Sequence, residues 1–337
     1  MRYTAVTQIP SIAIKQGTVP EGAQITIAIP TYKRAHLLRE TIDSCLAQQT
    51  NYPFAIMVVD NNPERECETE QLLREYEAIP HLFYYKNTEN VGMTGNWNKL
   101  FELAQTDFVI MLHDDDLLYD DYIEKMDKII NFYKNDVDDV DAVYPVIEIF
   151  THNKNSFKRQ INGAIKGMRL HPYDFQFGNT CNIAGVCFSR KSIIEENGFD
   201  DYFYPSLDYE MHVRLSKKNK AIKLFGIPLV LYRISENESI KTKTILNTAE
   251  KDKEIITSII RKYPSWYKKL FISFFKAYPK YMLLALKNKL SVTDQELEQK
   301  IIEYSKNVTL IDIFILKVMT QFKIKCMHLF RTRTLIK

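Results

Sequence analysis

The sequence has few cysteines and no long apolar run, and both shortages limit what the chain can be. Its five cysteines are odd in number and lack the paired spacing of a zinc site, so free thiols in a reducing cytosol are expected rather than a disulfide framework. No stretch of 18 uncharged apolar residues occurs, so a membrane-spanning helix is not expected. The N-terminus lacks a basic segment followed by an apolar core, so no signal peptide is expected either.

Charge is divided unevenly along the chain. The formal net charge is only +3. Residues 251–337, however, contain 18 Lys and Arg against 7 Asp and Glu, whereas residues 1–250 contain 27 against 35. An acidic body without a recognisable nucleic-acid-binding motif disfavours a nucleic-acid partner. A hydrophobic share of 45% is ample for a packed core, so disorder is not expected.

Short apolar runs alternate with helical patterns over the first third of the chain. The pattern predicts strands at 25–29, 54–59, 82–85 and 108–112, with helices at 35–48, 66–77 and 96–104 between them. Strand and helix in alternation are typical of right-handed βαβ units. We therefore expect an α/β fold with a mostly parallel central sheet flanked by helices. Further on, a strand is expected at 142–150, and Pro279 is expected to kink or interrupt a Lys-rich helix.

Three consecutive carboxylates follow the fourth predicted strand directly. Asp114, Asp115 and Asp116 come after the apolar run Phe108–Leu112, so they should emerge together at a carboxyl end of the sheet, where open parallel sheets bind ligands. Side chains that offer only oxygen favour Mg²⁺ or Mn²⁺ over zinc. A solvated acidic turn before the next helix explains this stretch equally well.

Four motifs in fixed order resemble those of family 2 glycosyltransferases, which have the GT-A (nucleotide-diphospho-sugar transferase) fold. The likeness covers about residues 25–235. It implies transfer of a sugar from a nucleotide diphosphate donor to a hydroxyl, with inversion at the anomeric carbon. The motifs are Ile27-Ala-Ile-Pro-Thr-Tyr-Lys-Arg34, Val58-Val-Asp-Asn-Asn62, Asn90-Val-Gly-Met-Thr-Gly-Asn-Trp-Asn98 and Leu112-His-Asp-Asp-Asp116.

The resemblance implies a nucleotide-sugar site and a metal site. It assigns Mn²⁺ or Mg²⁺ to Asp115 and Asp116, which would help the diphosphate to leave. His113 stands where many members carry another Asp, and we expect it to pack or to hydrogen-bond rather than to ligate the ion. Asn61 also departs from the acidic residue common there. The resemblance assigns the nucleotide-sugar, expected to be a UDP-sugar, to Pro30, Thr31, Tyr32, Arg34, Asp60, Asn61, Gly92, Asn96 and Asp114.

A general base is implied by the later run Ser206-Leu-Asp-Tyr-Glu210. Leu207 replaces the family's usual Glu, and Asp208 falls on its catalytic Asp, which would take the proton of the acceptor hydroxyl. An ordinary helix N-cap is the alternative explanation of Asp208. Three residues are assigned more weakly to the acceptor side, and the last of them is also a candidate for a phosphate contact: Asn182, Gly185 and Arg233.

These expectations divide the chain into three parts. Residues 1–24 form an irregular leader. Residues 25–240 form the catalytic domain, in which 25–118 bind the nucleotide-sugar and 119–240 the acceptor. Residues 241–337 form a basic helical region. Lysines beside aromatic residues suit a helix at an anionic membrane surface, although these helices could equally pack on the catalytic body or on a second subunit.

The resulting prediction is a metal-assisted enzyme of surface-polysaccharide synthesis, such as O-antigen or capsule. It would be cytoplasmic and peripheral at the inner face of the cell membrane, with a glycan or lipid-linked glycan as acceptor. A sugar nucleotidyltransferase is an alternative, but it needs a Gly-rich triphosphate loop, and residues 29–34 contain no glycine. A catalytically silent sugar-binding or scaffold protein with the same fold is a further alternative.

Overall fold

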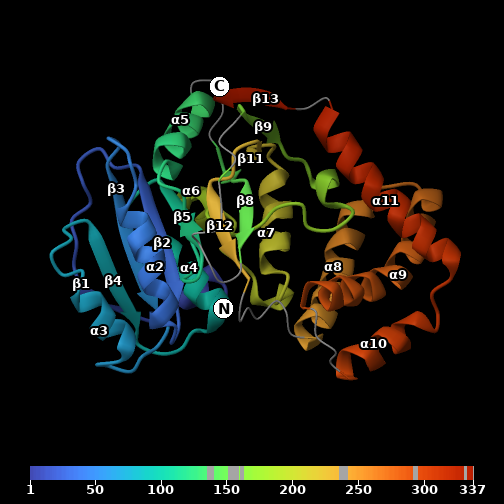
Figure 1. Ribbon diagram of the computed structural model, residues 1–337, viewed down its shortest axis with the longest axis horizontal. Coiled ribbons are helices and arrows are strands. Elements are labelled where there is room, and N and C mark those ends of the chain that lie inside the picture. Colours follow the sequence, from blue (N-terminus) through green and yellow to red (C-terminus); the bar gives the residue numbers. More distant parts are fainter. Residues whose placement is uncertain are drawn as a thin grey trace.

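The computed structural model describes residues 1–134, 140–150, 159, 163–234, 242–290, 295–329 and 332–336. Its main sheet has the strand order β1-β4-β3-β2-β5-β10-β7-β11-β9-β13, and a second sheet has the order β6-β12-β8. Helices lie against the main sheet, and the C-terminal helices α8 to α11 gather at the end of the molecule opposite β1 and β4 (Figure 1). The expected α/β class with a C-terminal helical region is confirmed.

The first βαβ units follow the predicted pattern closely. Their four strands pair in parallel in the order β4-β3-β2-β5, because each apolar run is buried on both faces and each helix places its apolar side on the sheet. The elements are β2 (Ile25–Thr31), α2 (Ala35–Leu46), β3 (Phe54–Asp60), α3 (Glu68–Arg74), β4 (Leu82–Asn87), α4 (Gly92–Leu103) and β5 (Phe108–Met111).

The strand predicted at 25–29 does not end before Pro30 but continues to Thr31. Pro30 pairs with Val59 of β3 inside β2. On its other side β2 pairs with β5 only as far as Ala28, so the N–H that Pro30 lacks has no partner strand to serve.

Residues 1–24 are not an irregular leader. They contain α1 (Tyr3–Val6) and β1 (Ser11–Lys15), and β1 adds an antiparallel edge strand to β4 with Ser11 opposite Asn87. The prediction was wrong here because a five-residue strand whose partner lies more than seventy residues away leaves little local pattern.

The second half of the sheet is mixed rather than mostly parallel. β10 pairs antiparallel with β5 and with β7, and β9 pairs antiparallel with β11. Among the described residues of the main sheet, only the pairing of β7 with β11 is parallel in this half. This part of the chain also supplies β6, β8 and β12 of the small sheet. Its elements are β6 (Leu117–Leu118), α5 (Tyr122–Lys134), β7 (Ala142–Tyr144), β8 (Ile147–Phe150), β9 (Ile165–Arg169), the 3₁₀ helices η2 (Pro172–Phe175) and η3 (Asp201–Phe203), β10 (Val186–Ser189), α6 (Arg190–Glu195), α7 (Leu207–Ser216), β11 (Ala221–Phe225) and β12 (Val230–Arg233).

The strand expected at 142–150 is two strands in two sheets. β7 belongs to the main sheet and β8 to the small one, with Pro145 between them. A proline cannot donate to a ladder, so pairing is interrupted there.

The C-terminal helices pack on the α/β body formed by the preceding residues. Their elements are α8 (Thr242–Ile260), α9 (Ser265–Leu290), α10 (Gln295–Ser305), α11 (Leu310–Leu329) and β13 (Arg333–Ile336). Phe271 and Phe274 of α9 are fully buried, with the ring of Phe271 stacked 5.7 Å from that of Phe177. α9 continues through Pro279, so of the two expected outcomes, a kink or an interruption, the interruption is excluded. Within the described part of the chain, every helix is too short or too polar to cross a bilayer.

Candidate active site

A cleft of about 810 Å³ opens beside the carboxyl ends of β2 and β5. Asp115, from the acidic triplet, and Asp208, from the start of α7, both line it. The structure thus brings together two groups that are 93 residues apart in the chain. The predicted site residues that line this cleft are Pro30, Thr31, Tyr32, Arg34, Asn61, Gly92, Asn96, Asp114, Asp115, Asn182 and Asp208.

Arg34 and Thr31 hold the first two carboxylates of the triplet. The Arg34 guanidinium donates to Asp114 at 2.8 Å and to Asp115 at 2.5 Å, and the Thr31 hydroxyl donates to Asp114 at 2.7 Å. Burial raises the pKa of Asp114 to about 6, although Arg34 and Thr31 counteract this effect. The guanidinium of Arg34 therefore compensates part of the negative charge of Asp114 and Asp115 at the carboxyl end of the sheet.

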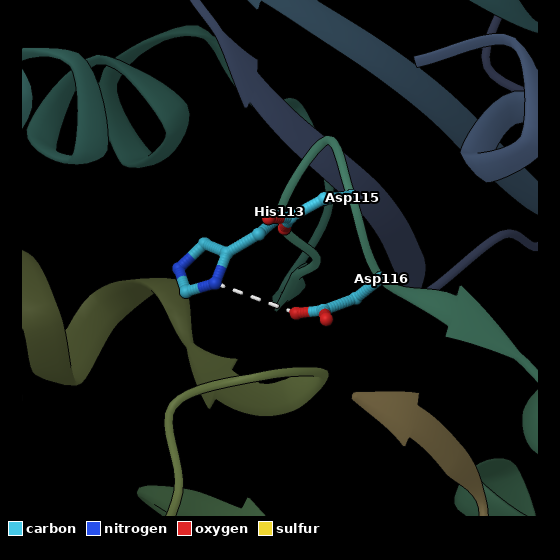
Figure 2. Close-up of side chains that lie close together, drawn as sticks. All are labelled: His113, Asp115 and Asp116. Atoms are coloured by element: carbon cyan, nitrogen blue, oxygen red, sulfur yellow. Dashed lines mark ion pairs between the residues drawn. The ribbon is translucent and has the colours of Figure 1, made fainter. Parts of the chain in front are cut away.

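Asp116, the third carboxylate, faces His113. Figure 2 shows the imidazole of His113 and the carboxylate of Asp116 pointing toward each other, and Nδ1 lies 3.4 Å from Oδ2. The His113 ring also stacks on Trp97, with centroids 5.5 Å apart. Burial raises the pKa of Asp116. Burial lowers the pKa of His113, but the neighbouring carboxylates, Asp116 first, outweigh it and leave that pKa raised.

The same side chains fit a divalent cation. His113, Asp115 and Asp116 each offer one ligand atom, and these atoms lie within 4.8 Å of one another. Nε2 of His113 is buried without a hydrogen-bond partner among the described residues, and Oδ2 of Asp116 has only the long 3.4 Å contact with Nδ1 of His113 there. Weakly satisfied polar atoms of this kind are expected where an ion binds. One imidazole nitrogen with two carboxylates suits Mn²⁺ better than Mg²⁺, which favours oxygen.

Arg233 supports the triplet from behind instead of facing the cleft. Its backbone N–H donates to Asp116 at 2.9 Å, its Nε donates to the carbonyl of Asp115 at 2.9 Å, and a terminal nitrogen lies 2.7 Å from Glu40. Its guanidinium also stacks over Phe150. These contacts bury the side chain, and the contact of Arg233 with acceptor or phosphate stays a prediction.

Asp60 also lies outside the cleft. Its side chain is fully buried and accepts from Lys86 at 2.9 Å, from the Tyr84 hydroxyl at 3.0 Å and from the backbone N–H of Asn62 at 2.9 Å. The register of β3 with β4 sets Lys86 directly opposite Asp60, and the expected contact of Asp60 with the nucleotide stays a prediction. A buried carboxylate requires such a cation.

Two more residues have structural explanations. Gly185 does not line the cleft. It has φ +67°, and a Cβ there would lie 2.6 Å from a methyl of Val230, so the backbone and the packing explain a glycine at this position. Asn96 does line the cleft, but it lies in the second turn of α4 and not at a helix N-terminus. Its amide donates to the Val59 carbonyl at 3.2 Å.

Asp208 stands at the beginning of α7 with Asn179 beside it. The amide of Asn179 donates to Oδ2 of Asp208 at 2.9 Å. Burial raises the pKa of Asp208, whereas Asn179 and two backbone N–H groups stabilise the ionised form. A carboxylate with a raised pKa at the edge of a cleft can accept a proton from a hydroxyl bound there.

Sequence reasoning missed the part of the cleft that the C-terminal helices supply. Thr244 and Thr248 of α8 and Met282 of α9 line it. Asp252 of α8 anchors this wall, since it accepts from Ser206 at 2.7 Å and from the Tyr278 hydroxyl at 2.8 Å. The apolar faces of these helices predicted packing, but no local signal indicated which surface they would meet.

Comparison with known proteins identifies the family of this chain. The model of the family described as glycosyl transferase family 2 matches residues 26–198. An uncharacterized glycosyltransferase of Methanocaldococcus jannaschii is 23% identical over 217 residues, which are 64% of this chain and 72% of that protein. The glucosyl-dolichyl phosphate glucuronosyltransferase of Haloferax volcanii is 25% identical over 181 residues, 52% of this chain and 56% of that protein.

Solved structures show the same fold at low sequence identity. S. aureus TarS 1–349 in complex with UDP-GlcNAc has a TM-score of 0.50 at 12% identity and covers 89% of this chain and 92% of that one. The mannosyltransferase PcManGT from Pyrobaculum calidifontis, in complex with GDP-Man and Mn²⁺, has a TM-score of 0.50 at 16% identity and covers 96% of this chain and 86% of that one. The family model spans more than half of the sequence, and the chain belongs to glycosyl transferase family 2.

Proposed function

We propose that this glycosyltransferase moves a sugar from a nucleotide diphosphate donor, a UDP-sugar, to a hydroxyl of a glycan or lipid-linked glycan, with inversion. The observation that carries the proposal is the shared cleft, in which Asp115 and Asp208 face one space large enough for a donor and an acceptor. A cleft that holds a leaving-group site and a base can perform transfer in a single displacement.

The donor binds, in this proposal, against the ends of β2 and β5. Pro30, Thr31 and Tyr32 border the nucleotide, and Arg34 is the cation nearest to a bound diphosphate. The fold neighbours named above support a nucleotide-sugar of this kind, since they were solved with UDP-GlcNAc and with GDP-Man. Asn61 and Asn96 line the same side.

His113, Asp115 and Asp116 are the residues proposed to hold a divalent ion, Mn²⁺ in preference to Mg²⁺. A bound ion would supply neutralisation of the charge that develops on the departing diphosphate. Asp114 remains with Thr31 and Arg34 on the nucleotide side.

Asp208 is the proposed general base. Its carboxylate takes the proton of the acceptor hydroxyl while the hydroxyl oxygen bonds to the anomeric carbon, and the bond from that carbon to the diphosphate oxygen breaks. Attack from the side opposite the leaving group inverts the configuration. Asn182 and Tyr204, on the same stretch of cleft as Asp208, suit the acceptor side.

The sequence-based division of the chain into parts is proposed with one change. Residues 25–118 form the donor half and 119–240 the acceptor half, but α8 and α9 complete the acceptor wall through Thr244, Thr248 and Met282. The helical region is thus proposed as part of the catalytic unit. Two other readings are less well supported. A nucleotidyltransferase lacks its glycine-rich loop here, and a silent scaffold leaves the cleft with both Asp115 and Asp208 unexplained.

Attachment to an anionic membrane is proposed through the outer face of α11. Leu310, Ile311, Phe314 and Val318 recur at helical spacing and are 85%, 68%, 67% and 46% exposed. Lys276 of the neighbouring α9 lies close to Asp312 of this helix, and α9 adds exposed lysines. Apolar side chains flanked by lysines match an anionic bilayer surface. This suits a cytoplasmic enzyme acting on a surface-polysaccharide precursor at the inner face of the membrane.

The proposed reaction is tested with a panel of nucleotide sugars, with Mn²⁺ or with chelator, by following release of nucleoside diphosphate. One uridine-linked donor should be turned over, and chelation should abolish turnover. Asp208→Asn should lose transfer by at least about a hundredfold while donor binding is retained. Asp127→Asn is the matched control, since Asp127 is a buried carboxylate with an Asn partner, Asn131, outside the cleft. Full turnover by Asp208→Asn would refute this choice of base.

Membrane attachment is tested by co-sedimentation with vesicles that contain phosphatidylglycerol. The double variant Ile311→Ser and Phe314→Ser should bind about tenfold more weakly than the unaltered chain, because it removes two exposed apolar anchors. Ile12→Ser, at another exposed apolar position on β1, is the control. Equal binding by all three proteins would exclude α11 as the attachment surface.

A further inference from the structure

A chain of hydrogen bonds leads from the interior of the protein to Asp208. Asp208 and His212 stand four residues apart on α7, which places them one above the other on the same side of the helix. Asn179, from the loop before β10, bridges them. Its Nδ2 donates to Oδ2 of Asp208 at 2.9 Å, and its Oδ1 lies 3.2 Å from Nδ1 of His212.

The orientation of this bridge is fixed by its neighbours. The backbone N–H of Cys181 donates to Oδ1 of Asn179 at 3.2 Å. A backbone N–H can only donate, so that atom of Asn179 is the oxygen, and its NH₂ group must face Asp208. Nδ1 of His212 must then carry a hydrogen in order to donate to the same oxygen.

His212 suits this role because it is neutral and enclosed. The side chain is fully buried, and burial lowers its pKa to about 3. A neutral imidazole carries one N–H, which the bridge assigns to Nδ1. Nε2, the other nitrogen, has no hydrogen-bond partner among the residues that the structure describes. This agrees with a lone pair on Nε2 in a pocket closed by Tyr144, whose ring centroid lies 4.6 Å away.

We propose that Asn179 is a positioning residue for the base, and that His212 acts through it by holding the amide in its donating orientation. The inference rests on the proposed function, since it assumes that Asp208 removes the acceptor proton. In this hydrogen-bond chain His212 donates to Asn179, and Asn179 donates to the carboxylate of Asp208. The chain therefore restrains the rotation of that carboxylate and favours its ionised form.

Few other titratable groups act on the pKa of Asp208. Among the described residues, the titratable groups that act on it are His113, from the turn after β5, and Tyr144 of β7. Lys223 of β11 acts on His212, which it helps to keep neutral. Loss of the Asn179 donor should thus leave the carboxylate without its one side-chain hydrogen bond from the loop.

Asn179→Leu tests the first link with a side chain of similar volume. At neutral pH kcat should fall roughly tenfold, because a hydrogen bond to a charged group is lost. The acid limb of the pH profile should move to higher pH, whereas KM for the donor should stay unchanged. Asn131→Leu is the matched control. It removes an Asn-to-Asp hydrogen bond of 2.8 Å on α5, outside the cleft, and should alter neither value. An unmoved acid limb in Asn179→Leu would overturn the proposal.

His212 variants test the second link. His212→Leu should move the acid limb in the same direction by a smaller amount. His212→Asn keeps an N–H near the position of Nδ1 and should restore much of the loss. Since His212 acts only through Asn179, the double variant Asn179→Leu, His212→Leu should have the acid limb of Asn179→Leu alone. Additive shifts would show that His212 has only a packing role.

A measurement that needs no turnover separates this inference from the proposed reaction. In protein labelled with ¹⁵N-histidine, the His212 signal should report hydrogen on Nδ1, and Asn179→Leu should release that tautomer preference. If no donor is turned over while the tautomer behaves in this way, the proposed reaction fails and the hydrogen-bond chain stands without its catalytic role. A His212 hydrogen on Nε2 would overturn the chain itself.

Discussion

The two walls of the cleft are built in different ways. The donor wall is formed by the ends of parallel strands that are adjacent in the sheet. Because β2 pairs with β5, Thr31 of β2 meets Asp114 after β5. The acceptor wall is assembled from distant segments, with Asp208 on α7, Asn179 in a loop and Thr248 on a C-terminal helix. A wall made from strand ends is specified by short motifs, whereas a wall made from packed helices depends on tertiary contacts.

The forces that hold the walls differ as well. Behind the donor wall lies a buried ion pair between Lys86 and Asp60, whose side chains are 2% and 0% exposed. The acceptor wall is held by aromatic packing, in which Phe271 contacts Phe177 and Phe274. The stability of the donor wall should therefore depend on the charge of Lys86, and the stability of the acceptor wall on the volume of the buried aromatic rings.

The largest expected effect is on the donor wall. Lys86→Met leaves Asp60 buried without its cation and should lower the free energy of unfolding by about 3–5 kcal/mol. Urea unfolding measures the change. Lys300→Met is the control, because Lys300 lies at the same 2.9 Å from Glu303 in an exposed pair, and its loss should leave the free energy of unfolding nearly unchanged. Similar losses in both variants would contradict the special role of burial.

The acceptor wall should respond to a cavity. Phe271→Ala removes a fully buried ring and should lower the free energy of unfolding by about 3 kcal/mol. It should also reduce transfer more than donor binding, since α9 reaches the cleft through Met282. The adjacent Ile272→Ala, at a side chain 57% exposed, should change stability by less than about 0.5 kcal/mol. A separate unfolding step for the helices would show that they are not part of the catalytic body.

The smallest expected effect is a shift in pH dependence that reports on the acceptor wall alone. Burial raises the pKa of Asp208, and the base must be ionised to accept a proton. A raised pKa keeps the carboxyl protonated to higher pH. As the pH is lowered, kcat should therefore begin to fall at a pH above the ordinary aspartate pKa of about 3.9. The profile of kcat with saturating donor measures this. A decline only near the ordinary value would mean that the carboxylate is solvated during turnover.

Much of the donor wall could be predicted from the sequence, because its residues follow apolar runs that identify themselves as strands. The exceptions involve partners in other strands. Nothing near Asp60 indicates that Lys86 will neutralise it, and nothing near Arg233 indicates that it will support Asp115 and Asp116. The pairing of β3 with β4 and of β12 with β6 decides both outcomes.

Of the acceptor wall, only Asp208, where a motif exists, and Asn182 could be predicted. Asn179 and Thr248 belong to no local pattern, and their roles depend on which helix packs where. The four-residue spacing between Asp208 and His212 was the one available signal, since it places both on one helix face. It does not specify Asn179 as the bridge.

The last strand has a consequence for how the helical region can be manipulated. β13 pairs with β9 at the margin of the main sheet, and Arg333 stacks on Phe132 of α5. With Asp252 bonded to Ser206 near the other end, the helical region is attached to the body near both of its ends as well as through Phe271. A truncation before β13 would remove the strand that pairs with β9. It would leave β9 as an unpaired edge strand, which can pair with other chains and aggregate. Surface substitutions are consequently cleaner probes of these helices than truncations.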